Sequence, residues 1–191
     1  ELALQKSRGM WSLVANNKLE KYIIVARDRL GIKPLWWARK DDVLVFSSEI
    51  KSIQTLFPAF KQKNYGVVSS FLLHGSLDED NSTFFQGISA FPKGCYLTTK
   101  SPRSFKPIPF WELDHSVKEE ALSLEELRSV FKETMSVHMR SDVPIGLALS
   151  GGIDSTAIAS FAKEDRDLEC FSLIHPAAQD ESCLLYTSDA A

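Results

Sequence analysis

The 191-residue sequence has few cysteines, no excess of positive charge and no long apolar run. Its three cysteines are irregularly spaced, which argues for a reducing compartment rather than a disulfide scaffold. The net charge of −3 gives no support for nucleic acid or an anionic membrane surface as a partner. No apolar run approaches the length of a membrane span, and the N-terminal residues show no signal-peptide pattern. We therefore expect a cytoplasmic protein with no nucleic-acid and no membrane partner.

Paired histidines and sequence repeats are also lacking. Helical spacing places His138 on an apolar stripe, with no second histidine one turn away. We interpret His138 as a core or interfacial residue and give none of the four histidines a catalytic role. With 44% hydrophobic and 25% charged residues, the composition is that of an ordinary globular protein of one or two domains.

Local sequence patterns predict several secondary-structure elements. Short strands are expected over residues 22–25 and 43–46. A third strand continues from Trp36 and Trp37 into a hairpin turn at Lys40, Asp41 and Asp42. Asn64 can cap a helix with an apolar face of Val67, Val68, Phe71 and Leu72. Ser123 and Glu126 form a capping box, which predicts a second helix that ends at about residue 139.

The most informative segment is residues 149–156, Leu-Ser-Gly-Gly-Ile-Asp-Ser-Thr, which follows an apolar run over residues 143–149. The pattern predicts a strand, a glycine-containing loop and a helix over residues 153–162. Gly151 and Gly152 can adopt backbone angles that turn consecutive N–H groups toward an anion. The N-terminus of the helix adds its free N–H groups and the positive end of its dipole. This arrangement is suited to holding a pyrophosphate.

Polar side chains of the same segment point to a nucleotide with a bound cation. Ser150 and Ser155 offer hydroxyl donors, and Asp154 offers a carboxylate suited to Mg²⁺. A Walker-type loop is excluded because it needs a lysine at its end, and the next lysine here is Lys163. The segment resembles the PP-loop of ATP pyrophosphatases, which cut ATP to AMP and pyrophosphate while adenylating a carboxylate or carbonyl. The alternative for an isolated Ser-Gly-Gly is an ordinary strand-to-helix turn.

A second set of motifs narrows the family. Residues 26–37 read Ala-Arg-Asp-Arg-Leu-Gly-Ile-Lys-Pro-Leu-Trp-Trp and are followed by Phe-Ser-Ser-Glu-Ile-Lys-Ser-Ile at 46–53. Together they resemble the latter part of the glutaminase domain of glutamine-hydrolysing asparagine synthetases. Shorter matches follow the same order at residues 9–11, 91–97, 141–146 and 180–182. Two departures are Cys95, where the family usually has histidine, and residues 174–178, which lack the family's usual glycine.

The resemblance implies a two-part fold. Residues 1–114 are expected to form the C-terminal part of an α+β glutaminase domain, an N-terminal-nucleophile hydrolase-like sandwich, together with the linker. Residues 115–182 are expected to begin an α/β PP-loop domain with a parallel sheet. Residues 183–191 look like a translated sequencing adapter, and we interpret them as an artefact.

The glutaminase nucleophile of the family is a cysteine at the processed N-terminus, with its free α-amine as base. The chain starts without Met, so we expect an internal segment whose nucleophile lies upstream. We accordingly assign no catalytic residue and expect no glutamine hydrolysis by this chain alone. Cys95 cannot replace the nucleophile because its amine is in a peptide bond. Cys170 is expected to be a buried structural thiol.

For Asp28, the resemblance implies binding of the α-ammonium group of glutamine. The alternative for this residue is a turn-capping aspartate paired with Arg27 or Arg29. From the residue alone the turn-capping role would be preferred, and only the surrounding motif favours substrate binding.

For the synthetase half, the resemblance implies that ATP and Mg²⁺ are the cofactors. The matching ATP and pyrophosphate positions are Leu149, Ser150, Gly151, Gly152, Asp154, Ser155 and Leu173, with Asp154 as the metal ligand. In the family, aspartate attacks the α-phosphorus of ATP, and ammonia from glutamine then displaces AMP from β-aspartyl-AMP. Both leucines flank adenosine in this interpretation, and the alternative is that they are core residues of parallel strands.

Three functions are open from the sequence. The first is asparagine synthase (glutamine-hydrolysing), which acts on glutamine, aspartate and ATP and allows for a homodimer of the full-length protein. The second is a relative such as a β-lactam synthetase, or an amidotransferase of polysaccharide or peptide maturation. The third is a non-catalytic nucleotide-binding scaffold, against which the intact PP-loop argues.

Overall fold

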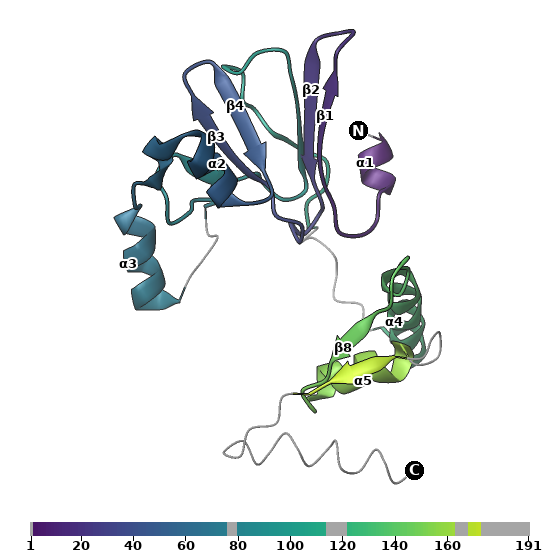
Figure 1. Ribbon diagram of the computed structural model, residues 1–191. Helices are drawn as coiled ribbons and strands as arrows, with labels where there is room; N and C mark the ends of the chain where they lie inside the picture. Colours follow the sequence, from purple (N-terminus) through teal and green to yellow (C-terminus); the bar gives the residue numbers. More distant parts are fainter. Residues whose placement is uncertain (1, 76–79, 114–121, 163–167, 173–191) are drawn as a thin grey trace. The chain divides into compact units, whose positions relative to one another are not determined.

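The computed structural model describes residues 2–75, 80–113, 122–162 and 168–172 of the chain. It divides into two compact units, Glu1–Ser116 and Val117–Ala191, and each is described by itself. Figure 1 shows the helices and strands of both units along the sequence.

The first unit contains two antiparallel sheets with short helices beside them (Figure 1). Its elements are α1 (Leu2–Lys6), β1 (Ser12–Asn17), β2 (Tyr22–Arg27), β3 (Trp36–Lys40), β4 (Val43–Ser47), α2 (Ile50–Leu56), the 3₁₀ helix η1 (Pro58–Lys61), α3 (Tyr65–His74), β5 (Ile88–Ala90), β6 (Cys95–Thr99) and β7 (Ile108–Pro109). One sheet has the strand order β1-β2-β6-β7, and the other has the order β4-β3-β5. The three predicted strands and the hairpin turn are confirmed.

The two sheets of this unit share one apolar core. Val25 of β2 and Leu97 of β6 are opposite each other in the ladder, and both are buried against Phe91. Trp37 of β3 and Phe46 of β4 are also directly paired, and they pack against the same cluster from the other sheet. Because alternate residues of a strand point to opposite faces, the neighbouring residues of β3 and β4 face away from this core.

A second core lies on that opposite face of the β4-β3-β5 sheet. Ala38 of β3, Ile88 of β5 and Ile53 of α2 are all fully or almost fully buried there. The helix α2 thus covers the outer face, while the shared core lies on the inner face. This is the alternation expected of strands that are buried on both sides.

The helix α3 begins after Asn64, as predicted, but its cap differs from the expectation. The Asn64 side chain makes no capping hydrogen bond, and its backbone carbonyl instead accepts from the Val68 N–H at 3.0 Å. Phe71 packs edge-on against Phe84 at 5.4 Å between ring centroids. Leu72 is 76% exposed, so the predicted four-residue apolar face is only partly covered in this unit.

The second unit consists of two helices and a two-stranded parallel sheet. Its elements are α4 (Leu124–His138), β8 (Gly146–Ala148), α5 (Ile153–Ala162) and β9 (Glu169–Phe171). The strand β8, the helix α5 and the parallel strand β9 make a β-α-β arrangement. The rings of Phe131 and Phe161 lie 4.9 Å apart and join α4 to α5.

The predicted burial of Cys170 is wrong, and His138 is not a core residue of this unit as far as the structure describes it. Cys170 is exposed, because all three residues of β9 are exposed in the two-stranded sheet. His138 is also exposed, and its Nδ1 lies 2.8 Å from the Thr134 carbonyl oxygen one turn earlier. In both cases the spacing identified the face on which the residue lies, but no described element covers that face.

The start of α4 is the predicted capping box. The Ser123 hydroxyl oxygen accepts a hydrogen bond from the Glu126 N–H at 3.2 Å, and the Glu126 carboxylate accepts from the Ser123 N–H at 2.9 Å. These bonds satisfy two of the N–H groups left unpaired at a helix start. Hydrogen bonds from the backbone and then the hydroxyl of Ser123 lower the pKa of the Glu126 carboxyl.

We expect Ser123→Ala to weaken the first turn of α4. Amide hydrogen exchange there should quicken roughly fivefold, the usual consequence of losing a serine N-cap. Ser136→Ala, in the last turn of the same helix and exposed, is the matched control and should leave exchange in the first turn unchanged or slower. Equal exchange rates in the two variants would show that the capping box does not hold the turn.

In the described part of the chain, no helix is both long and apolar enough to cross a membrane.

Candidate functional site

The Ser-Gly-Gly segment lies between the end of β8 and the start of α5. Gly151 has φ +84, a left-handed backbone angle that residues with a side chain rarely adopt, and it is buried. Gly152 is exposed and begins the helix, because its carbonyl oxygen accepts from the Thr156 N–H at 3.0 Å. The glycine loop and the helix therefore form as the sequence predicts.

Two hydroxyl groups meet across this loop. Ser150 Oγ lies 3.1 Å from Ser155 Oγ, and the Gly152 N–H points to Ser150 Oγ at 3.4 Å. Ser155 also donates to the Gly152 carbonyl oxygen at 3.0 Å. The predicted pyrophosphate residues are thus gathered within one turn of backbone.

The start of α5 carries backbone donors for an anion. Within the described residues, the backbone N–H groups of Ile153, Asp154 and Ser155 have no hydrogen-bond acceptor. Free N–H groups at a helix start, together with the helix dipole, favour an anion. The Asp154 side chain is exposed on the same turn.

The groups at the start of α5 fit Mg²⁺ that is bound together with pyrophosphate better than Mg²⁺ that is held by protein ligands alone. Among the described residues, no three histidine, cysteine or acidic side chains are placed so that they could hold a metal ion together. Mg²⁺ is commonly held by one or two carboxylates together with phosphate oxygens and water. Asp154 alone can provide such a carboxylate.

The structure describes only one of the two leucines that are expected to flank adenosine. Leu149 is half-buried, and its N–H donates to the Phe171 carbonyl oxygen at 2.9 Å, so it continues the pairing of β8 with β9. Leu173 lies outside the described residues, as do residues 180–182 and the tail 183–191. Adenosine contact by either leucine stays a prediction.

Asp28 follows β2 in the first unit and is 1% exposed. Its Oδ1 accepts from the N–H groups of Leu30 and Ile32 at 3.2 and 2.9 Å. Its Oδ2 accepts from the N–H groups of Trp11 and Lys33 at 3.3 and 2.9 Å. One buried carboxylate therefore holds the backbone of residues 30–33 and the start of β1.

These bonds decide the charge state of Asp28. Burial raises the pKa of the carboxyl, but the four backbone N–H donors together outweigh it, and the pKa lies below its ordinary value. The side chain is consequently ionised at neutral pH. This geometry favours the turn-capping alternative, with backbone donors in place of the expected arginine pairing.

The loop that Asp28 caps is also held from outside. The Arg27 guanidinium donates to the carbonyl oxygens of Gly31, Lys33 and Phe91 at 2.6, 2.9 and 2.8 Å. The Asp28 carbonyl oxygen accepts from the N–H of Gly94 at 2.9 Å. The Arg-Asp-x-x-Gly motif thus builds a rigid turn.

Cys95 begins β6 and is half-buried. Burial, and next the negative charge of Glu112, raise the pKa of its thiol. A thiol with a raised pKa is protonated at neutral pH and is a poor nucleophile. This state agrees with the expectation that Cys95 is not the glutaminase nucleophile.

Comparisons with known proteins cover both units. The family model for the glutamine amidotransferase domain matches residues 1–111, and the family model for asparagine synthase matches residues 126–184. The chain is 34% identical over 179 residues to asparagine synthetase [glutamine-hydrolyzing] 2 of Bacillus subtilis. It is 27% identical over 186 residues to a putative asparagine synthetase [glutamine-hydrolyzing] 2 of Methanocaldococcus jannaschii. It is also 32% identical over 158 residues to amidase chry2 of Gibberella zeae.

These alignments include 87%, 94% and 80% of the chain, but only 24%, 36% and 23% of the respective relatives. The chain thus spans about a quarter to a third of the length of the proteins that it matches. A mixed α/β structure in which a glutamine amidotransferase domain precedes the start of an asparagine synthase domain fits both units. The chain belongs to the glutamine-hydrolysing asparagine synthetase family.

Proposed function

We propose that the whole protein is an ATP-dependent carbon–nitrogen ligase that takes its amide nitrogen from glutamine. The favoured reaction forms asparagine from aspartate through β-aspartyl-AMP, with release of AMP and pyrophosphate. The observation that carries this proposal is the loop between β8 and α5, where N–H groups without an acceptor among the described residues lie in the same turn as two serine hydroxyls. Family membership supports the glutamine half of the reaction.

Each residue of the loop has a distinct task in this proposal. The N–H groups of Ile153, Asp154 and Ser155 donate to oxygens of the β- and γ-phosphates. Ser150 Oγ and Ser155 Oγ, now paired with each other, turn toward the same oxygens. Asp154 would hold Mg²⁺, which when bound neutralises the charge that builds on the leaving pyrophosphate. Stabilising that charge lowers the barrier to attack by the aspartate carboxylate on the α-phosphorus.

The glutamine amidotransferase half supplies ammonia in this scheme. The binding of the glutamine α-ammonium by Asp28 remains a prediction. It requires the carboxylate to exchange at least one of its four backbone hydrogen bonds for the substrate. The observed geometry supports a structural role, in which Asp28 shapes the turn that follows β2.

A second candidate is a related amide-forming enzyme with another acceptor. It is favoured by one observation, namely that the Gibberella amidase is nearly as similar in sequence to this chain as the Bacillus asparagine synthetase is. The phosphate loop serves either enzyme equally well, because activation by ATP does not depend on which carboxylate is adenylated. Aspartate-dependent formation of asparagine by the whole protein separates the two candidates.

Binding of inorganic pyrophosphate with Mg²⁺ tests the loop in the chain as it stands. A Cβ at Gly152 would meet only Ser150 Oγ at 3.4 Å, so Gly152→Val should fold but should obstruct the approach of phosphate. We expect the variant to weaken pyrophosphate binding by about tenfold or more, since charge-assisted hydrogen bonds are lost. Backbone amide NMR of residues 150–155 measures the binding.

Gly66→Val is the matched control, because a Cβ at Gly66 would also meet a single side-chain oxygen, Asn64 Oδ1, at 3.5 Å. It lies in α3 and should leave the affinity for pyrophosphate unchanged. If Gly152→Val binds pyrophosphate as tightly as the control does, the loop is not the phosphate site. An unchanged spectrum of the parent chain on addition of magnesium pyrophosphate would count against it equally.

A further inference from the structure

A cleft of about 550 Å³ lies in the first unit, where three turns come together. The turns join β1 to β2, join β3 to β4, and follow the end of β6. The cleft is separate from the phosphate loop, which belongs to the other unit. Neither the family motifs nor the proposed reaction gives it a role.

The charge lining this cleft is mainly positive. Lys18, Lys21 and Lys100 line it, and among the described residues Asp42 is the only acidic one that does so. In the part of the chain that the structure describes, none of the three lysines forms an ion pair. Three ammonium groups around one opening attract an anion from solution.

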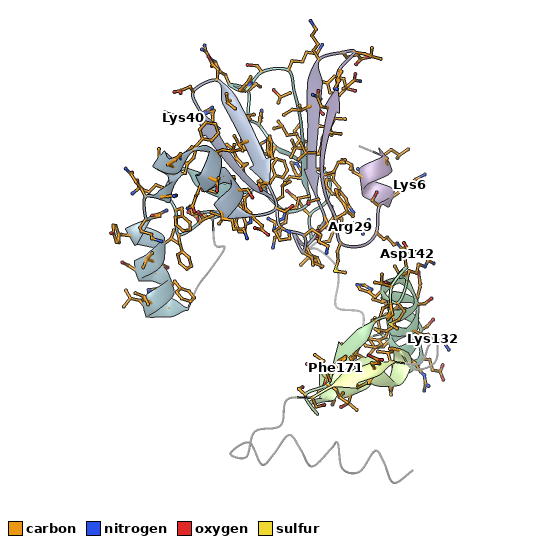
Figure 2. All side chains as sticks on the ribbon, in the orientation of Figure 1. Lys6, Arg29, Lys40, Lys132, Asp142 and Phe171 are labelled. Carbon is orange, nitrogen blue, oxygen red and sulfur yellow. The ribbon has the colours of Figure 1, made fainter. Side chains whose placement is uncertain are left out.

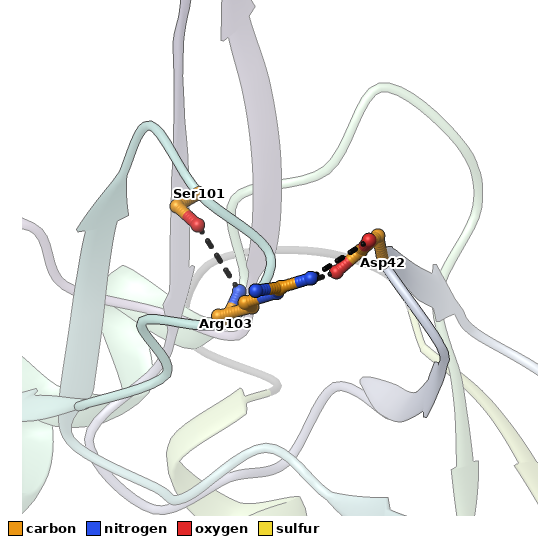
Figure 3. Close-up of polar contacts among 3 residues, drawn as sticks. All are labelled: Asp42, Ser101 and Arg103. Atoms are coloured by element: carbon orange, nitrogen blue, oxygen red, sulfur yellow. Dashed lines mark hydrogen bonds and ion pairs between the residues drawn. The ribbon is translucent and has the colours of Figure 1, made fainter.

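Asp42 is already neutralised by a neighbouring arginine. Figure 3 shows Arg103 donating to both oxygens of Asp42, from Nε at 2.7 Å and from Nη2 at 3.1 Å. The Arg103 N–H also donates to Ser101 Oγ at 3.3 Å. This two-point pair joins the segment after β6 to the β3–β4 hairpin and occupies both oxygens of Asp42, so this carboxylate does not pair with the lysines.

Most of the other lining residues are apolar or aromatic. Ile23, Val43, Leu44, Pro102 and Tyr22 line the cleft, together with the polar residues Asn16, Thr99 and Ser101. A small inorganic anion would use the lysines but none of this apolar surface. A ligand that joins an anionic group to a flat apolar body would use both, as is usual for small-molecule sites.

The cleft also lies far from the turn capped by Asp28. Tyr22 and Arg27 are the first and last residues of β2, which places them about 17 Å apart in an extended strand. Figure 2 shows Lys40, next to the cleft hairpin, and Arg29, next to Asp28, at opposite ends of the sheets. A ligand in this cleft therefore acts at a distance from that turn.

We propose that the cleft is a binding site for a small organic anion, a phosphate monoester or carboxylate carried on a flat apolar group. The lysines hold the anionic group, and the apolar lining together with Tyr22 holds the body.

Phenyl phosphate is the probe, and inorganic phosphate and benzyl alcohol test its two halves separately. Backbone amide NMR of the 191-residue chain follows residues 16–23 and 99–101. Phenyl phosphate is expected to shift these amides at a concentration about tenfold or more below that needed for inorganic phosphate or for benzyl alcohol. The reason is that phenyl phosphate gains from charge and from apolar contact together. Shifts confined to residues 150–155, or equal affinity for inorganic phosphate, would overturn the proposal.

Charge variants locate the site. The triple variant Lys18→Gln, Lys21→Gln, Lys100→Gln is expected to weaken phenyl phosphate by about tenfold or more at low salt. Its matched control, Lys6→Gln, Lys61→Gln, Lys132→Gln, changes the net charge equally and should keep the parent affinity. Equal loss in both would mean that only net charge attracts the probe, and the proposal would be wrong.

Asp42→Asn tests the same proposal with a substitution that should strengthen binding of phenyl phosphate. The substitution removes the carboxylate and releases the Arg103 guanidinium, so it is expected to strengthen phenyl phosphate binding by about threefold. An exposed ion pair contributes little to folding, so the unit should remain folded. Weaker binding in this variant would contradict the assigned role of the lysines.

Discussion

Asp28→Asn is expected to destabilise the first unit by about 3 kcal/mol, because two hydrogen bonds to a charged acceptor are lost. In the parent chain, each carboxylate oxygen accepts two backbone N–H groups, and the side chain is buried. An asparagine amide can replace only one of these oxygens. In either orientation its NH₂ group would face two backbone donors, which would then be left unpaired.

Tryptophan fluorescence during urea unfolding measures this effect, since all four tryptophans lie in the first unit. Asp41→Asn is the matched control. Asp41 is in the exposed β3–β4 turn with φ 53, a backbone angle that asparagine tolerates, and its pairing with Lys40 is exposed. A loss of stability that is equally small in both variants would argue against Asp28 as the organiser of its turn.

The stability of the first unit should also depend on pH through Asp28. Folding lowers the pKa of Asp28 from its ordinary value of 3.8, so the contribution of this carboxylate to stability is present above that pH. The contribution is lost as the pH falls through the folded-state pKa. The parent should therefore lose stability below about pH 4, and Asp28→Asn should lack this part of the loss. Parallel pH curves for the two proteins would show that the ionised carboxylate is not what holds the turn.

The same variant separates the two roles considered for Asp28. If the carboxylate caps the turn, the whole protein loses stability first and glutamine affinity only as a consequence. If it binds the glutamine ammonium directly, glutamine affinity falls while the urea midpoint stays near that of the parent.

Local motifs predicted the elements that depend on neighbouring residues. The capping box needs only Ser123 and Glu126, three positions apart, so it can be identified without knowledge of the tertiary structure. The β3–β4 hairpin likewise depends on two adjacent strands and the turn at Asp41. The loop between β8 and α5 was also predictable, because its glycines follow an apolar strand directly.

Burial of a side chain by residues that are distant in the sequence could not be predicted in the same way. The four donors to Asp28 include the N–H of Trp11, which lies 17 residues upstream, and nothing in the motif shows that the carboxylate is enclosed. The burial of Cys170 and a core position for His138 were predicted wrongly for a related reason. Residue spacing tells which side chains share a face, but it does not tell whether another element covers that face. The cleft at Lys18 and Lys100 was missed because its lining residues come from three separate turns.

Asp154→Ala is expected to abolish adenylation in the whole enzyme while leaving glutamine hydrolysis largely intact. Aspartate-dependent pyrophosphate release should fall by about a hundredfold or more, since the carboxylate that would hold Mg²⁺ beside the leaving phosphates is lost. Glutamine hydrolysis should persist because it is assigned to the other unit and uses no phosphate chemistry. Ammonia and pyrophosphate, measured in parallel on one preparation, give the ratio that decides the point.

Glu169→Ala is the control for removing one carboxylate from the same unit. Glu169 is exposed on β9 and pairs with Gly146, at the end of the two-stranded sheet away from the loop, whereas Phe171 pairs with Ala148 next to the loop. It should therefore keep the parent rate of pyrophosphate release. If Asp154→Ala retains that rate as well, or if glutamine hydrolysis falls together with it, Asp154 does not hold the cation and the phosphate loop has another function.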